Sequence, residues 1–233
     1  MMVNAVDPNG TWLHRAGGIS ALVFGIGYII IIALYVPIGA PPSGAEARLA
    51  YYGGNTRLWW AILSLSVLTD FLLVPAVFAL YITLKEINKN AMLLATAFVG
   101  LFIVLDLTLT WTNIASLIVL SSSYAAATND APKAVFVTAA MYPSSVVESS
   151  LLFIYNSLTF AIGILITGLV MLKGMFGKST AYLGLLTGIL GIVSVTSSFF
   201  SSSLSAVTII LASILTTLWA FFIGYRLYEL GRQ

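Results

Sequence analysis

Two aspartates, Asp70 and Asp106, are the residues best placed to do chemistry, because each interrupts a long apolar segment. Asp70 lies fifteen residues before Lys85, and Asp106 lies seventeen residues after Lys89. At a rise of about 1.5 Å per residue, these separations correspond to roughly 22 and 26 Å along a helix. We therefore expect the two carboxyl groups at similar depth on two consecutive antiparallel membrane helices.

A carboxyl group in the middle of a membrane costs about 2.5–3.5 kcal/mol on insertion scales, so it usually faces the helix bundle and has a partner. No lysine or arginine lies inside an apolar segment to act as that partner. Three states stay open: the carboxyl groups hold protons, bind a cation, or accept hydrogen bonds from neutral side chains. The neutral donors at suitable helical spacing are Ser66, Thr110 and Asn113.

Pro75 follows Asp70 by five residues. A proline in a helix leaves the carbonyl four residues earlier, here that of Phe71, without its donor, and it kinks the helix. Transporters often form ion sites from oxygen ligands beside such broken helices. The alternative is a tolerated proline beside a protonated, hydrogen-bonded aspartate, and the residues alone leave both interpretations open.

The fourth apolar segment adds Glu148 near its outer end and Asn156 at greater depth. Glu148 is either solvated at the membrane surface or lines an outward-facing mouth that leads to the aspartates. The candidate binding residues are Asp70, Asp106, Asn113, Glu148 and Asn156. The residues predict no catalytic set and no metal site.

The elements that must position these side chains follow from composition. The chain has 233 residues, of which 60% are hydrophobic and 8% are charged, whereas a soluble domain carries about 25% charged residues. Since roughly 20 apolar residues span a bilayer as a helix, the length predicts a single all-α transmembrane bundle of residues 1–233 with six spans. The expected spans are residues 16–36, 58–84, 91–120, 145–172, 181–199 and 204–225.

Lysine and arginine set the expected orientation, because positive residues concentrate on the cytoplasmic side. With the N-terminus inside, seven of the ten lie on the inner side: Arg15, Lys85, Lys89, Lys173, Lys178, Arg226 and Arg232. The other three, Arg48, Arg57 and Lys133, lie outside. We expect a multi-pass protein of the cell membrane with both termini cytoplasmic and the lipid bilayer as its first partner.

The outer connections differ in length. Two of them, residues 38–57 and 121–144, are long, and the stretch 131–141 is apolar enough to lie on the membrane surface or else serves as a plain connector. The connection at residues 201–203 is short, which predicts that the last two spans form a helical hairpin. Gly184, Gly188 and Gly191 in the fifth span favour close packing inside the bundle.

Several classes of function are excluded or disfavoured. The chain has no cysteine and one histidine, so it lacks the ligands for thiolate metal sites and bis-histidine haem, and we expect no cofactor. The net charge is +2, and the sequence contains no run of basic residues that would bind nucleic acid. The sequence Gly177-Lys178-Ser179-Thr180 resembles the end of a phosphate loop, but Leu172 replaces the required glycine. Val104-Leu105 before Asp106 likewise departs from the glycine-rich context of intramembrane aspartyl proteases, so an enzyme is not predicted.

The chain also resembles an uncharacterised prokaryotic family of six-helix membrane proteins, number 4386 among the domains of unknown function. The resemblance implies six spans and no particular activity. It rests on His14-Arg15-Ala16-Gly17-Gly18, Asn55-Thr56-Arg57, Leu80-Tyr81, Leu84-Lys85, Ala91-Met92-Leu93-Leu94-Ala95, Gly168, Tyr182-Leu183-Gly184-Leu185-Leu186, Gly188, Gly191 and Leu218-Trp219.

Two hypotheses of function follow. The first is a transport or binding protein for a small solute or ion, coupled to protons, that uses the intramembrane carboxylates. The alternative is a non-catalytic accessory or structural subunit of a larger membrane complex, whose partners are other membrane subunits or a second copy of the chain. The fold alone does not decide between them.

Overall fold

The computed structural model describes residues 8–232, which are helical apart from short connections and contain no strand in that range. The predicted all-α class is therefore confirmed. In chain order the elements are α1 (Pro8–Tyr35), α2 (Ala45–Gly54), α3 (Thr56–Leu105), the π-helix η1 (Asp106–Trp111), α4 (Thr112–Ala126), α5 (Asp130–Glu148), α6 (Ser150–Met171), α7 (Lys178–Ser197) and α8 (Ser202–Leu230).

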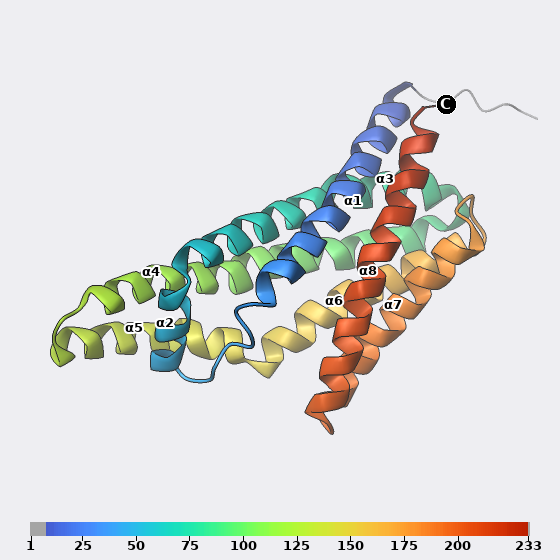
Figure 1. The fold of residues 1–233 in the computed structure, drawn as a ribbon. Coiled ribbons are helices and arrows are strands. Elements are labelled where there is room, and N and C mark those ends of the chain that lie inside the picture. Colours follow the sequence, from blue (N-terminus) through green and yellow to red (C-terminus); the bar gives the residue numbers. More distant parts are fainter. Residues whose placement is uncertain (1–7, 233) are drawn as a thin grey trace, which may run out of the picture.

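Helix α3 reverses direction within its own length (Figure 1). Asn88 has the extended angles φ −156° and ψ 91°, which break the helix. Its side-chain oxygen accepts a hydrogen bond from the N–H of Ala91 at 3.1 Å and so begins the returning leg. Residues 56–87 and 89–105 are thus two antiparallel legs, and the second leg continues through η1 into α4.

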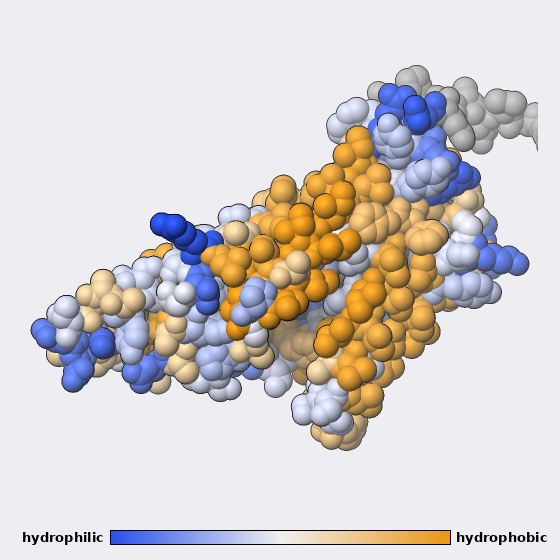
Figure 2. Space-filling view, in the orientation of Figure 1, coloured by the Kyte–Doolittle hydropathy of each residue, from blue (hydrophilic) through white to orange (hydrophobic). Residues whose placement is uncertain are grey.

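Five helical runs of the described chain are long and apolar enough to cross a membrane. They are Thr11–Tyr35, Thr56–Ala126, Ser150–Met171, Lys178–Ser197 and Ser202–Leu230. Their outward side chains give the bundle the broad apolar surface seen over α1 and α8 in Figure 2. A soluble protein rarely exposes so large an apolar surface, so the structure agrees with the coarser expectation of a membrane protein.

Helix ends on the side that the sequence predicts to be outside differ from the expected spans. Residues 145–148, expected to open the fourth span, belong to α5, because Ser149 adopts φ −65° and ψ 124° and separates α5 from α6. The third expected span, 91–120, continues to Ala126. Asp70, Asp106 and Asn156 nevertheless lie within the expected helical segments.

The stretch 131–141 is helical and so is more than a plain connector. It is part of α5, which runs back along α4 while α2 packs on both helices (Figure 1). Ala140 is completely buried in this contact. We call α2, α4 and α5 the outer lobe. Its core contains Trp59, whose ring contacts those of Tyr35 and Tyr52 at centroid distances of 5.4 and 4.7 Å.

Glycines set the spacing of the bundle helices. A Cβ added at Gly18 would lie 2.6 Å from the backbone nitrogen of Tyr228, and one added at Gly224 would lie 2.9 Å from the carbonyl of Gly18. Backbone atoms cannot yield as a flexible side chain does, so α1 and α8 reach this distance only without side chains. A Cβ at Gly188 would similarly lie 2.8 Å from the carbonyl of Ala161, which confirms the predicted internal packing of the fifth span.

We predict that Gly18→Ala destabilises the fold by about 1–3 kcal/mol, the usual range for overpacking a tight contact. The measurement is the free energy of unfolding in detergent. Gly100→Ala is the matched control, because nothing lies within 4 Å of a Cβ added at that helical position. Equal stability of the two variants would contradict the packing role of Gly18.

Candidate functional site

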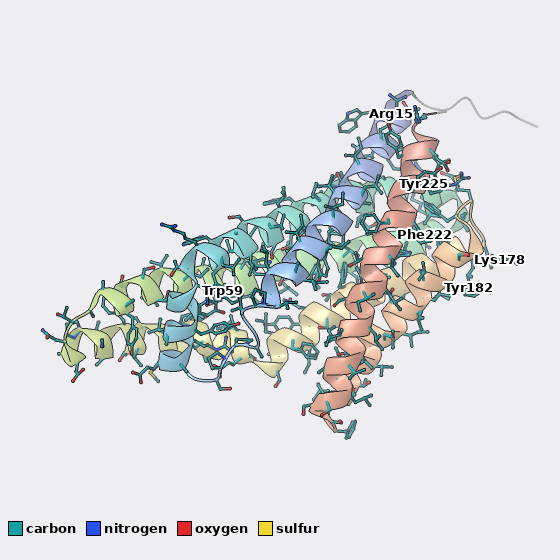
Figure 3. The ribbon with its side chains drawn as sticks, in the orientation of Figure 1. Arg15, Trp59, Lys178, Tyr182, Phe222 and Tyr225 are labelled. Atoms are coloured by element: carbon teal, nitrogen blue, oxygen red, sulfur yellow. The ribbon has the colours of Figure 1, made fainter. Side chains whose placement is uncertain are left out.

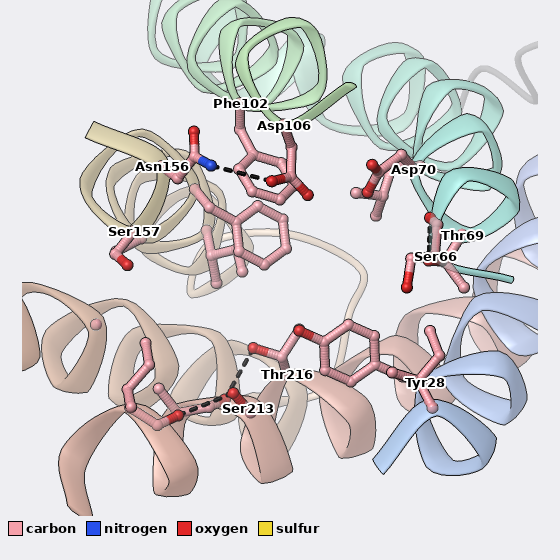
Figure 4. A pocket seen from close by; sticks show the side chains of 18 of the residues that line it. Tyr28, Ser66, Thr69, Asp70, Phe102, Asp106, Asn156, Ser157, Ser213 and Thr216 are labelled. Atoms are coloured by element: carbon pink, nitrogen blue, oxygen red, sulfur yellow. Dashed lines mark hydrogen bonds between the residues drawn. The ribbon is translucent and has the colours of Figure 1, made fainter. Parts of the chain in front are cut away.

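A cavity of about 360 Å³ lies inside the bundle, between α1, both legs of α3, η1, α6, α7 and α8. Most of its lining is apolar and aromatic. The polar side chains that Figure 4 labels around it are Tyr28, Ser66, Thr69, Asp70, Asp106, Asn156, Ser157, Ser213 and Thr216. Each helix of the bundle contributes to the cavity wall, so the cavity exists only when the whole bundle is assembled.

Asp70, on the first leg of α3, and Asp106, at the beginning of η1, point toward one another (Figure 4). Their exposed fractions are only 5% and 9%. The indole N–H of Trp111 donates to an Oδ2 of each carboxyl group, at 3.0 Å in both cases. One N–H therefore bridges the two buried carboxyl groups and places them side by side.

Asn156 of α6 completes the surroundings of Asp106. Its Nδ2 donates to Oδ1 of Asp106 at 3.0 Å and to the hydroxyl oxygen of Thr110 at 2.9 Å. Thr110 is itself hydrogen-bonded to Asp106. Asp106 thus accepts hydrogen bonds from both Trp111 and Asn156, and Asp70 accepts one from Trp111.

The π-helix η1 explains how Trp111 reaches Asp106. A π turn forms hydrogen bonds between residues five apart, and such turns occur often at functional sites. Residues five apart, such as Asp106 and Trp111, therefore lie closer to one face than in an α-helix. The same turn removes Asn113 from the site: its Nδ2 donates instead to the carbonyl of Leu109 at 2.6 Å. Asn113, one of the candidate donors, is thus engaged by the backbone of its own helix.

The other candidate partners of the two aspartates are Thr110, Ser66 and the carbonyl of Phe71. Thr110 is bonded to Asp106 as expected. Ser66 does not hold Asp70, because its hydroxyl has no hydrogen-bond partner. Neither Phe71 nor Pro75 is among the residues that line the cavity. Pro75 instead faces Gly17 of α1.

Glu148 lies away from the cavity, at the end of α5 and outside the runs that could cross a membrane. It accepts hydrogen bonds from the backbone N–H of Gly44 at 2.9 Å and from Nε of Arg48 at 2.7 Å. The side chain of Arg48 is only 8% exposed. The structure therefore gathers Asp70, Asp106 and Asn156 in one site and gives Glu148 a different task, fastening α2 to the α5–α6 junction.

Sequence reasoning missed the central donor, Trp111, and the cavity residues of α1, α7 and α8. The five-residue spacing of Trp111 from Asp106 predicts a contact only if the helix contains a π turn at that point. Thr187 and Ser213 are each one of several hydroxyl residues in α7 and α8, and nothing in their spacing distinguishes them from the others.

Comparisons of the chain with protein-family models, with curated proteins and with solved structures found no match. The resemblance to the six-helix family therefore stays a prediction, and the chemistry of the site is argued from its own residues.

The Glu148 contacts generate a pH prediction. The backbone N–H of Gly44, and then Arg48, hold the pKa of the Glu148 carboxyl below its ordinary value. The stability that these contacts provide is complete above that ordinary value and is lost as pH falls through the lowered pKa. We expect Glu148→Gln to cost about 1–3 kcal/mol near pH 7, because buried Arg48 loses a charged acceptor. The difference in stability between Glu148→Gln and wild type should become smaller as the pH falls.

Thermal unfolding in detergent from neutral to acidic pH measures this effect. Glu86→Gln is the control, because the side chain of Glu86 is 84% exposed and its contact with Lys85 is 4.0 Å long. A gap between Glu148→Gln and wild type that stays constant down to pH 3 would contradict the role of the carboxylate.

A separate prediction concerns Trp111. Trp111→Phe keeps a ring but removes the N–H that serves both carboxyl groups, so we expect a loss of about 1.5–3 kcal/mol in stability. We also expect a shift of the carboxyl C=O band in infrared difference spectra. Trp60→Phe, at a 41% exposed position, should leave both unchanged. An unshifted band in Trp111→Phe would show that the indole is not a partner of the pair.

Proposed function

We propose that the chain is an integral membrane protein that binds or transports a small solute or ion in exchange for protons at the Asp70–Asp106 pair. The observation that carries the proposal is a carboxyl pair, bridged by the indole N–H of Trp111, that faces a cavity inside a bundle of apolar helices. Within residues 8–232, neither aspartate forms an ion pair with a cationic side chain. Intramembrane carboxyl groups commonly mark ion pathways and proton relays.

In the proposed resting state the two carboxyl groups hold one proton between them and carry a single negative charge, because two like charges so close together disfavour double ionisation. The approach of a cation favours loss of that proton, and departure of the cation favours its return, because each replaces the other as the positive partner. Such a pair therefore couples solute binding to proton release. A purely structural pair would not need a cavity beside it.

The proposal includes a six-span arrangement with both termini inside. Asn88 divides the run Thr56–Ala126 into two legs, each longer than about 20 residues, the length that spans a bilayer. Arg15 and Lys178 lie toward the end of the bundle away from the outer lobe, whereas Trp59 lies beside the lobe (Figure 3). Nε of Arg15 donates to the carbonyl of Gly231 at 2.6 Å, which joins the beginning of α1 to the end of α8. This polar end is the proposed cytoplasmic side.

A second candidate function is that of an accessory subunit, and one observation favours it. The outer lobe extends beyond the bundle (Figure 1) and exposes large apolar side chains on α5, with Val135, Met141 and Tyr142 at 65%, 60% and 72% exposure. The partner would be another membrane subunit or a second copy. Repeated recovery of the chain alone from native membranes in mild detergent would count against this function.

Proton movement in proteoliposomes tests the first proposal. Vesicles that enclose a pH-sensitive dye receive sodium, potassium, a neutral amino acid, a carboxylic acid or a small amine on the outside. We expect at least one of these solutes to move protons, and we expect Asp70→Asn and Asp106→Asn to lower the rate at least tenfold.

The control is Asp130→Asn, in the first turn of α5 and outside the cavity, which should behave like wild type. If no solute moves protons faster in wild type than in the double variant Asp70→Asn/Asp106→Asn, the proposed function is wrong.

A further inference from the structure

The cavity has a polar end and an apolar body. The polar end consists of Asp70, Asp106 and Asn156, and the apolar body includes Phe24, Ile31, Leu73, Phe102, Phe153 and Phe160. Its volume of about 360 Å³ lies within the range of organic ligand sites. A bare inorganic ion would occupy a small part of this space, and it would leave the aromatic walls without a partner.

Unpartnered hydroxyl groups face the same space. Ser66 and Thr187 line the cavity at 2% and 3% exposure, and neither hydroxyl oxygen has a hydrogen-bond partner. Oδ1 of Asn156 is also without one. Buried polar groups are nearly always satisfied in native proteins. Three unsatisfied oxygens on α3, α6 and α7 therefore indicate a ligand that brings hydrogen-bond donors.

Aromatic faces complete the surroundings of a positive charge. Tyr28 of α1 lies across the cavity from the carboxyl pair (Figure 4), and the rings of Phe102 and Phe160 pack at a centroid distance of 4.5 Å beside it. Aromatic rings attract ammonium groups through their negative faces. An ammonium nitrogen between Tyr28 and the aspartates would have both an acceptor pair and a ring.

The cavity opens sideways between α1 and α8. The two helices touch at Gly25 and Phe221 and then diverge, and Figure 2 shows a hollow between their apolar surfaces. The surfaces of both helices around the hollow are apolar in Figure 2, and Ile30 of α1 and Ile210 and Ile214 of α8 are 45%, 58% and 47% exposed. Apolar flanks are those of an opening to lipid rather than to water.

From these contacts we infer that the solute is an amphipathic organic cation, an amine with an apolar body, which reaches the cavity from the lipid between α1 and α8. The inference rests on the proposed function and names its substrate class. The ammonium group takes the place of the shared proton at Asp70 and Asp106 and donates to the free oxygens. The apolar body lies against the phenylalanine rings.

Binding to the purified chain in detergent tests the charge requirement. The probes are 4-phenylbutylamine, its uncharged analogue 4-phenylbutanol, and sodium ion, with binding measured by calorimetry and proton release by a pH-sensitive dye. We expect the amine to bind at least tenfold more tightly than the alcohol, to release protons, and to lose tenfold or more in affinity in Asp70→Asn and in Asp106→Asn. Ser66→Ala, which keeps the carboxyl pair, should weaken amine binding.

The cavity is tested as the binding site by filling it. The chain has no cysteine, so Ser213→Cys, in the cavity wall on α8, can be labelled uniquely with a bulky maleimide. We expect the labelled form to bind the amine at least tenfold more weakly than the same variant before labelling. Ser202→Cys, at the exposed beginning of α8, should bind the amine with or without the label.

The outcomes separate the two proposals. If sodium or an amino acid moves protons through the carboxyl pair while the amine does not bind, the proposed function stands and the inference is overturned. Equal affinity for amine and alcohol, or amine binding that survives Asp70→Asn/Asp106→Asn, also overturns it. If no solute moves protons and the amine still binds at the pair, the proposed exchange fails and the binding site remains.

Discussion

The hydrogen bonds from one indole N–H to two carboxyl groups are the interaction on which the interior of this protein depends. Trp111 lies 3.0 Å from an oxygen of both Asp70 and Asp106. That geometry requires the two legs of α3 to lie in one register, which the break at Asn88 sets. It also requires the π turn of η1, without which Trp111 would point away from Asp106.

Close packing in the rest of the bundle offsets the free-energy cost of burying the polar site. Glycines at the α1–α8 and α6–α7 contacts let backbones touch, as in Gly18 against Gly224 and Gly188 against Ala161. Without a hydrophobic effect between membrane helices, such contacts supply the association free energy. Where α1 and α8 no longer have glycine contacts, beyond Gly25, the helices separate and the cavity begins.

The outer lobe keeps the far ends of the helices in place. Trp59 lies among the rings of Tyr35, Tyr51 and Tyr52, and so joins α1, α2 and α3. The ion pair of Arg48 with Glu148 joins α2 to the α5–α6 junction, close in the chain to the helix that carries Asn156. The outer lobe thus connects α1, α3 and α6, three of the helices that line the cavity.

The sequence alone determined the helical class, the membrane-like composition and the matched depth of Asp70 and Asp106, because apolar length and helical rise are local properties. It also indicated Asn156, by depth. Only the tertiary structure decided which donors meet the carboxyl groups: a single π turn shifts the register, which selects Trp111 and removes Asn113. Pairing between distant helices decided that Glu148 meets Arg48 instead of the cavity. Such contacts depend on helix rotation and spacing, which neither hydropathy nor periodicity specifies.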